Sequence, residues 1–185
     1  SRDLLSVELS TTSIDYATKE ATASGHKEIG EDILKLKTIL EKLSREKTNI
    51  TTYEAKISKE DFTRKITEYI NYEELSGNLA FIAEQTREHK QKSTAGGLAL
   101  FLTSWTGPDE AFTRILTKGF TKKGKPTISL AYKCLDPSLL LKPLAEEAYA
   151  LIAMSGTLTP LTLYKDLFGF VSETTSYLSP FPLTN

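Results

Sequence analysis

Two short stretches of the chain carry side chains that could do chemistry. The first is Ser155-Gly156-Thr157, where two hydroxyls and a glycine follow the continuous apolar run 148–154. The second is the segment 118–125, Lys-Gly-Phe-Thr-Lys-Lys-Gly-Lys, which holds four lysines and one phenylalanine. Hydroxyls beside a glycine suit hydrogen bonding at a turn, whereas lysines beside an aromatic ring suit phosphate contact and base stacking.

The hydroxyl stretch does not indicate nucleophilic catalysis. Neither of the two histidines, His26 and His89, is near it in sequence, and the spacing is not Gly-x-Ser-x-Gly, so a hydrolase elbow has no support. We predict instead that these residues end a buried strand, where ligands and moving parts gather in α/β sheets. A plain structural turn is the alternative, and the residues alone leave both interpretations open.

The basic residues after residue 107 are candidates for nucleic-acid contact. A solvated hairpin tip, whose lysines discourage edge pairing, is the alternative for the lysine-rich segment. Trp105, at the end of an apolar stretch, is predicted to pack in the core rather than to stack on a base. The candidate DNA-binding residues are Arg114, Lys118, Phe120, Lys122, Lys123 and Lys125.

The composition limits the possible functions. The chain has 185 residues and a net charge of −1, so any contact with nucleic acid must come from a local patch. The single cysteine, Cys134, allows neither an internal disulfide nor a four-cysteine metal or iron–sulfur site. No phosphate loop and no Asp-Glu-Ala-His motif occurs, so we expect no nucleotide, cofactor or metal site in this chain.

The location in the cell is predicted from the same composition. Sparse cysteine favours a cytoplasmic setting, and no apolar run approaches the roughly 20 residues that cross a bilayer. The chain begins Ser1-Arg2-Asp3, which we interpret as a cut inside a longer protein.

The surrounding pattern is helical first and mixed afterwards. The residues Ile29, Ile33, Leu36, Leu40 and Leu43 form a heptad-type seam, which either packs on neighbouring helices or offers a face to a partner. Gly107-Pro108 is a firm break. The predicted helices cover 11–23, a stretch around 29–43, 59–70, 72–92, 94–105, 137–147 and 161–168. The predicted strands cover 4–9, 111–118, 127–134 and 148–154. A linker is predicted from residue 171.

Several motifs in the second half together resemble the XPD family of superfamily 2 DNA helicases, most closely its archaeal members. The matching stretches are Tyr132 to Ser138 (Tyr-Lys-Cys-Leu-Asp-Pro-Ser), Lys142-Pro143, 155–161 (Ser-Gly-Thr-Leu-Thr-Pro-Leu) and Tyr164 to Leu167. The resemblance implies that Ser155, Gly156 and Thr157 are helicase motif III, which couples nucleotide state to DNA grip without doing chemistry. Residues 5–10 are similar to the segment shortly after the DEAH box of that family.

The resemblance also implies a fold and a domain order. The expected fold is mostly α with a small α/β portion, in which a helical Arch domain is inserted in a RecA-like motor domain that is only partly present. The segment 1–10 would belong to motor domain 1, 11–118 to the Arch, 119–168 to the last part of motor domain 1 with motif III, and 169–185 to a linker toward motor domain 2.

The activity implied for the parent protein is ATP-dependent 5′-to-3′ DNA unwinding in nucleotide excision repair. Its ATP, Mg²⁺ and iron–sulfur cluster would bind to parts outside this chain, so the chain alone should be inactive. Its expected partners are single-stranded DNA and the remaining helicase domains, in the cell interior or, in a eukaryote, the nucleus. The alternative function is a helical module that docks repair proteins through the seam.

Overall fold

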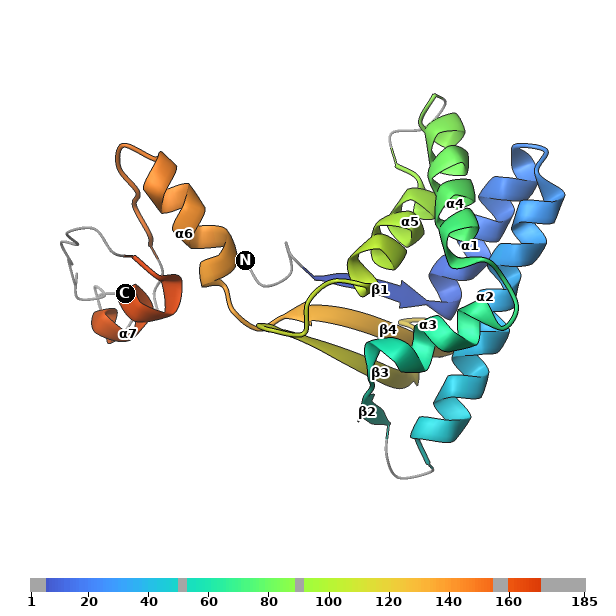
Figure 1. The fold of residues 1–185 in the computed structure, drawn as a ribbon, viewed down its shortest axis with the longest axis horizontal. Coiled ribbons are helices and arrows are strands. Elements are labelled where there is room, and N and C mark those ends of the chain that lie inside the picture. Colours follow the sequence, from blue (N-terminus) through green and yellow to red (C-terminus); the bar gives the residue numbers. More distant parts are fainter. Residues whose placement is uncertain (1–5, 50–52, 89–91, 155–159, 171–185) are drawn as a thin grey trace, which may run out of the picture. The chain divides into compact units, whose positions relative to one another are not determined.

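The fold is known from a computed structural model that describes residues 6–49, 53–88, 92–154 and 160–170 (Figure 1). The chain divides into two compact units, of which one covers Ser6–Leu135 and the other contains the residues from Asp136 onward. The elements of the first unit are β1 (Val7–Ser10), α1 (Thr11–Ala23), α2 (Lys27–Lys47), β2 (Glu54–Lys56), α3 (Lys59–Thr67), α4 (Tyr72–Arg87), α5 (Thr94–Trp105), β3 (Phe112–Phe120) and β4 (Pro126–Cys134). The second unit contains α6 (Ser138–Glu147) and α7 (Leu161–Phe168).

A four-stranded antiparallel sheet organises the first unit. The strand order is β1-β4-β3-β2, so the first strand in the chain lies beside the last strand of this unit. Leu9, Leu130 and Leu116 lie opposite one another across three strands, and each is fully buried. Because side chains alternate along a strand, this row gives the sheet one apolar face that the helices cover.

Helices α1 and α2 form a hairpin that packs on α5 and on the sheet. Ser10 caps α1 by accepting a hydrogen bond from the backbone N–H of Ser13 at 3.1 Å, while the Ser10 N–H donates to the Ser13 hydroxyl at 2.9 Å. Gly25, with φ of +86°, adopts the left-handed conformation that lets the chain reverse before α2. The predicted helix over 11–23 and the predicted break at Ser24-Gly25 are confirmed.

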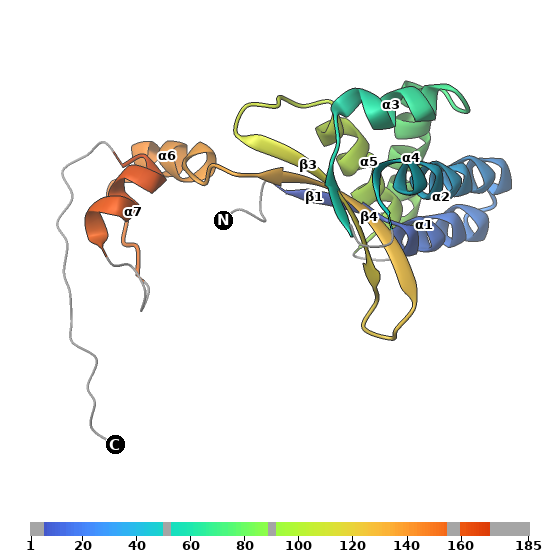
Figure 2. The same cartoon turned by 90° about the horizontal axis from the view of Figure 1, so that it is seen from below.

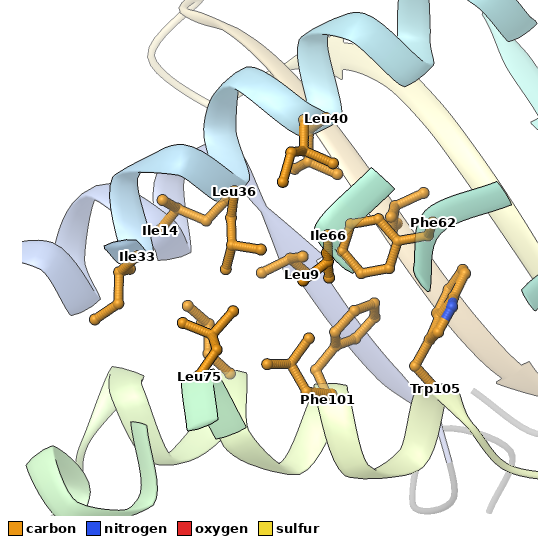
Figure 3. Close-up of a cluster of buried hydrophobic side chains, with 14 of the residues drawn as sticks. Leu9, Ile14, Ile33, Leu36, Leu40, Phe62, Ile66, Leu75, Phe101 and Trp105 are labelled. Atoms are coloured by element: carbon orange, nitrogen blue, oxygen red, sulfur yellow. The ribbon is translucent and has the colours of Figure 1, made fainter. Parts of the chain in front are cut away.

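The core lies between the sheet and the helices (Figure 3). Phe62, Phe101 and Trp105 form an aromatic cluster in which the rings of Phe62 and Trp105 meet edge to face, 5.2 Å apart. Trp105 is fully buried, and its indole N–H donates to the Lys59 carbonyl at 3.1 Å. Its predicted core role is therefore confirmed. The seam residues Ile33, Leu36, Leu40 and Leu43 are also fully buried, and Ile29 packs partly buried against them.

The second unit has a different character. Neither α6 nor α7 contains a buried residue. Apolar side chains on both helices are exposed, among them Leu139, Leu144, Leu163 and Leu167. Gly169, with φ of +68°, ends α7 and comes close to Ser138 and Lys142 of α6. The described part of this unit therefore has apolar helices but no buried core of its own.

Three sequence predictions need correction. Residues 148–154 do not form a buried strand, because they are irregular and Tyr149, Ile152 and Met154 are largely exposed. A strand needs a neighbour to pair its N–H and C=O groups, and no described strand lies beside this run. Helix α3 ends at Thr67 rather than Ile70, and α4 ends at Arg87 rather than Lys92.

The fold class is confirmed at the coarse level, as a mostly helical chain with a small antiparallel sheet. The expected boundary between residues 118 and 119 falls inside β3, which pairs with β4 along its whole length. The strands of both predicted segments therefore belong to one compact unit, Ser6–Leu135. The Arch and RecA-like assignments remain predictions.

Candidate nucleic-acid interface

The lysine-rich segment forms the tip of the β3–β4 hairpin, which extends beyond the helices in Figure 2. The turn is held by two backbone hydrogen bonds of 2.8 Å, from the Thr121 N–H to the Lys125 carbonyl and from the Gly124 N–H to the Thr121 carbonyl. Gly124 has φ of +74°, a conformation that glycine adopts without strain. The segment therefore joins β3 to β4 as a hairpin, and its tip has a defined backbone.

The side chains of this tip face solvent. Phe120 is 73 % exposed, and Lys122, Lys123 and Lys125 are exposed as well, while Lys118 is half-buried. None of the four lysines takes part in an ion pair among the residues that the structure describes. The tip therefore combines uncompensated positive charge with an exposed aromatic ring.

An open groove of about 970 Å³ lies beside the hairpin tip. The opposite wall is α1, whose residues Thr12, Asp15, Tyr16 and Lys19 share one face of the helix. Lys37 and Glu41 of α2 also line it, as does Tyr53 before β2. At the start of α1, the Thr11 hydroxyl lies 3.0 Å from the Thr127 hydroxyl and accepts from the Ile128 N–H at 3.3 Å. These contacts fix α1 against β4.

The groove has a positive balance of charge. Six lysines line it, against the two carboxylates of Asp15 and Glu41. Asp15 is already paired, because Lys37 Nζ lies 2.8 Å from its Oδ1 and 3.0 Å from its Oδ2. Lys19 Nζ lies 5.8 Å from the centre of the Tyr16 ring. The remaining lysines are therefore available to an anionic ligand.

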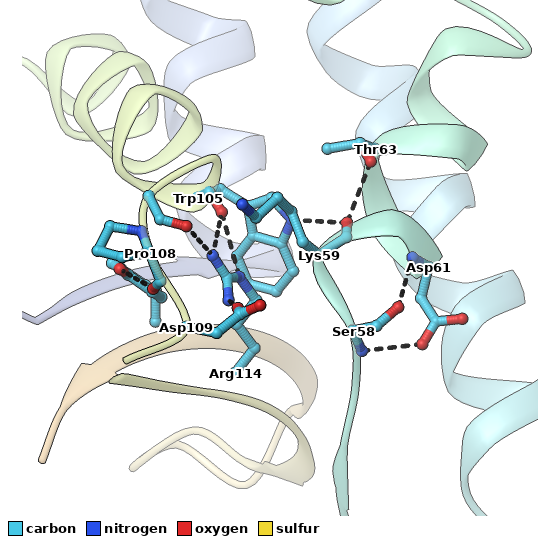
Figure 4. Close-up of polar contacts among 10 residues, drawn as sticks. Ser58, Lys59, Asp61, Thr63, Trp105, Pro108, Asp109 and Arg114 are labelled. Carbon is cyan, nitrogen blue, oxygen red and sulfur yellow. Dashed lines mark hydrogen bonds and ion pairs between the residues drawn. The ribbon is translucent and has the colours of Figure 1, made fainter. Parts of the chain in front are cut away.

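Arg114 does not belong to this interface. Its side chain is 2 % exposed, and its guanidinium donates to the Trp105 carbonyl at 3.1 and 2.7 Å and to the Gly107 carbonyl at 2.8 Å (Figure 4). It also forms an ion pair with Asp109. We therefore remove Arg114 from the candidate DNA contacts and assign it to the turn between α5 and β3.

Tyr132 completes the arrangement around that turn. Its ring lies 4.6 Å from the Arg114 guanidinium carbon, and its hydroxyl donates to the Pro108 carbonyl at 2.7 Å. Burial raises the pKa of Tyr132 above its ordinary value, although the positive charge of Arg114 acts in the opposite direction. A Cβ at Gly107 would lie 2.8 Å from the Tyr132 hydroxyl, so this close approach requires glycine. The cluster is structural and holds the base of the hairpin.

The other predicted site, Ser155, Gly156 and Thr157, lies outside the described residues. Asp136, which follows β4, accepts a hydrogen bond from the Ser138 N–H at 2.8 Å at the beginning of α6. A hydrogen bond with the Ser138 side chain, and then the one from the Ser138 N–H, lower the pKa of Asp136. Asp136 therefore stabilises the turn that leads into α6.

The described residues contain no group of three or more histidine, cysteine or acidic side chains that could hold a metal ion. With a single cysteine, the chain does not fit a four-cysteine iron–sulfur cluster. In the part of the chain that the structure describes, no helix is long and apolar enough to cross a membrane.

A scan against protein-family models found no match to this chain, and a search of curated proteins found none either.

Sequence reasoning missed the α1 wall of the groove. Tyr16 is 57 % exposed and Tyr53 is 60 % exposed, and neither residue was predicted to line a binding surface. An aromatic residue on the polar face of α1, three residues before Lys19, was an available signal. The pairing of β1 with β4, which brings α1 beside the hairpin, could not be deduced from local spacing.

Proposed function

We propose that this chain is the Arch and motif III portion of an ATP-dependent 5′-to-3′ DNA helicase of nucleotide excision repair, and that it contacts and gates single-stranded DNA. The observation that carries the DNA contact is the β3–β4 hairpin tip, which presents Phe120 and the lysines 118, 122, 123 and 125 beside an open basic groove. Such a surface suits phosphate neutralisation together with base stacking.

The second unit supports the proposal that further motor-domain parts belong beside it. Residues 148–154 form a continuous apolar run that is exposed, and α6 and α7 expose leucines. Contiguous exposed apolar surface marks an interaction site. In the proposed helicase, a motor domain would cover these residues and add strands beside 148–154. The coupling role of Ser155 and Thr157 rests on the sequence resemblance alone.

The alternative function, a protein-docking helical module, depended on an exposed seam along α2. Four of its five residues are fully buried, and Ile29 is partly buried. The seam therefore belongs to the core and is not a docking face. This result favours the nucleic-acid proposal over the alternative.

The test is a binding titration of the 185-residue chain with a fluorescent single-stranded 20-mer, read by anisotropy at several salt concentrations. If all four hairpin lysines neutralise phosphates, the slope of log K against log salt should be about −3, since each phosphate contributes about −0.7. Replacing Lys122, Lys123 and Lys125 with glutamine should reduce this slope by about 2.

The proposal also predicts that the pure chain does not turn over ATP with DNA and Mg²⁺ present. A chain that binds no single-stranded DNA at low salt, or that hydrolyses ATP, would contradict the proposal.

A further inference from the structure

We infer that the groove between α1 and the β3–β4 hairpin is a two-walled track for single-stranded DNA, in which Tyr16 and Tyr53 stack on bases together with Phe120. This inference rests on the proposed DNA contact and extends it from the hairpin tip to α1 and to the segment before β2. It assigns a ligand-binding role to Tyr16, Lys19 and Tyr53.

Three exposed aromatic side chains in the groove are the first observation that supports base stacking. Tyr16, Tyr53 and Phe120 are 57 %, 60 % and 73 % exposed, and all three line the same groove. Tyr53 is held beside the hairpin, because its carbonyl accepts a hydrogen bond of 2.7 Å from the Lys118 N–H. Exposed rings cost free energy in water, and unpaired bases offer them a flat apolar face. Bases inside a duplex are already stacked, so the groove favours single strands.

The lysines on the two walls of the groove are the second observation. Lys19 is on the α1 wall, and Lys118, Lys122, Lys123 and Lys125 are on the hairpin wall. Among the described residues, none of these five takes part in an ion pair. A strand lying between the walls would have ammonium groups on both sides of its phosphates. The location of Lys19 beside the Tyr16 ring brings a phosphate contact and a stacking platform together on α1.

The ion pair of Asp15 and Lys37 gives the groove a charge that can be changed to test DNA binding. The Asp15 carboxylate lies in the groove, where it holds Lys37 by two hydrogen bonds. The negative charge of Asp15 therefore repels phosphate, and its ion pair with Lys37 keeps that one of the six groove lysines from contacting DNA. Removing its charge without changing its shape should release Lys37 to the DNA, so that affinity rises rather than falls.

The experiment compares two matched double variants of the full chain by anisotropy with the same 20-mer. Tyr16→Ala with Lys19→Gln removes a cation–aromatic pair from the groove. Lys42→Gln with Tyr69→Ala removes a similar pair, with the Lys42 ammonium 4.7 Å from the Tyr69 ring, that does not line it. We expect the groove variant to bind about tenfold more weakly, because one stacked base is lost, and the control to stay within about twofold of the original chain.

Two further arms make the test independent of folding damage. Asp15→Asn should tighten binding and steepen the salt slope by about 0.7, which a merely structural role for Asp15 would not produce. A blunt duplex of the same length should compete more than about tenfold less well than the single strand.

The outcomes separate the inference from the proposed function. If the chain binds single-stranded DNA but the groove variant binds as tightly as the control, the groove inference is overturned and the hairpin contact stands. The groove inference is also overturned if the duplex competes as well as the single strand. It is overturned as well if Asp15→Asn leaves both the affinity and the salt slope unchanged. A chain that binds no single-stranded DNA overturns both.

Discussion

A basic side chain close in sequence to the lysine-rich segment 118–125 does not necessarily belong to the proposed binding surface. Arg114 and Lys118 are four positions apart on β3, yet Arg114 points into the protein. Because the two positions are an even number of residues apart, their side chains are on the same face of the strand. Their surroundings differ because Arg114 lies beside the turn after α5, whereas Lys118 lies near the hairpin tip. Arg114 satisfies the Trp105 and Gly107 carbonyls, which the chain exposes as it leaves α5. Its charge serves the turn rather than a ligand.

This role predicts a loss of stability from Arg114→Met. The substitution keeps apolar volume but removes the donor from the buried Trp105 carbonyl and the partly buried Gly107 carbonyl, which should cost about 2–4 kcal/mol in the free energy of unfolding. Asp109→Asn is the matched control, since the Asp109 side chain is 77 % exposed and should cost less than about 1 kcal/mol. Urea unfolding followed by circular dichroism measures both. Equal stability of the two variants would contradict the role assigned to Arg114.

At the scale of elements, Glu20 joins α1 to the beginning of α5. Its carboxylate accepts hydrogen bonds from the Thr94 N–H at 2.8 Å, the Ala95 N–H at 3.0 Å and the Ser93 hydroxyl at 2.9 Å. Burial raises the pKa of Glu20, but these hydrogen bonds outweigh it, so the pKa lies below its ordinary value. A side chain from another helix thus supplies the acceptor that the first N–H groups of α5 need.

The lowered pKa of Glu20 predicts a pH-dependent contribution to stability. Because the folded pKa is depressed, the contribution is complete above the unfolded value of about 4.3 and is lost as the pH falls through the folded pKa. Glu20→Gln should therefore lower the free energy of unfolding by about 1 kcal/mol at pH 7, with a smaller difference below about pH 4. Urea titrations at both pH values measure it, with the exposed Glu31→Gln as control. A difference that does not shrink in acid would contradict it.

Local patterns predicted most elements but not their assembly. The helices over 11–23, 94–105 and 161–168 have the predicted bounds, and Ser58 and Asp61 form a capping box at the start of α3 (Figure 4). Caps and periodicity act over a few residues, so they can be read locally. The prediction of a buried strand over 148–154 is wrong, because an apolar pattern favours burial but does not provide the neighbouring strand that must pair with it. The groove was missed because it depends on β1 pairing with β4, more than 100 residues away.

At the scale of the molecule, the buried apolar core belongs to one part of the chain, and the helices of the other described part expose apolar side chains and contain no buried residue. The described buried apolar residues run from Leu9 to Cys134, whereas α6, α7 and residues 148–154 contribute exposed leucines, Tyr149, Ile152 and Met154. Burial of apolar area is the main favourable term in folding. The unit Ser6–Leu135 therefore contains the apolar burial that stabilises the described fold, whereas α6, α7 and residues 148–154 add exposed apolar side chains.

This division predicts that a chain ending at Leu135 folds as stably as the full chain. The rings of Phe62, Phe101 and Trp105 remain in the shorter chain, as do the sheet and the groove. The melting temperature should therefore stay within about 3 °C, a shift of roughly 1 kcal/mol in the free energy of unfolding for a chain of this size. Binding of a dye that reports exposed apolar surface should fall, because residues 148–154 and the leucines of α6 and α7 are gone. Calorimetry and dye fluorescence on the two chains measure these effects, and single-stranded DNA affinity provides a third comparison, which should be unchanged. A shorter chain that is unfolded, or that melts more than about 10 °C lower, would show that residues after 135 contribute to the core of the first unit.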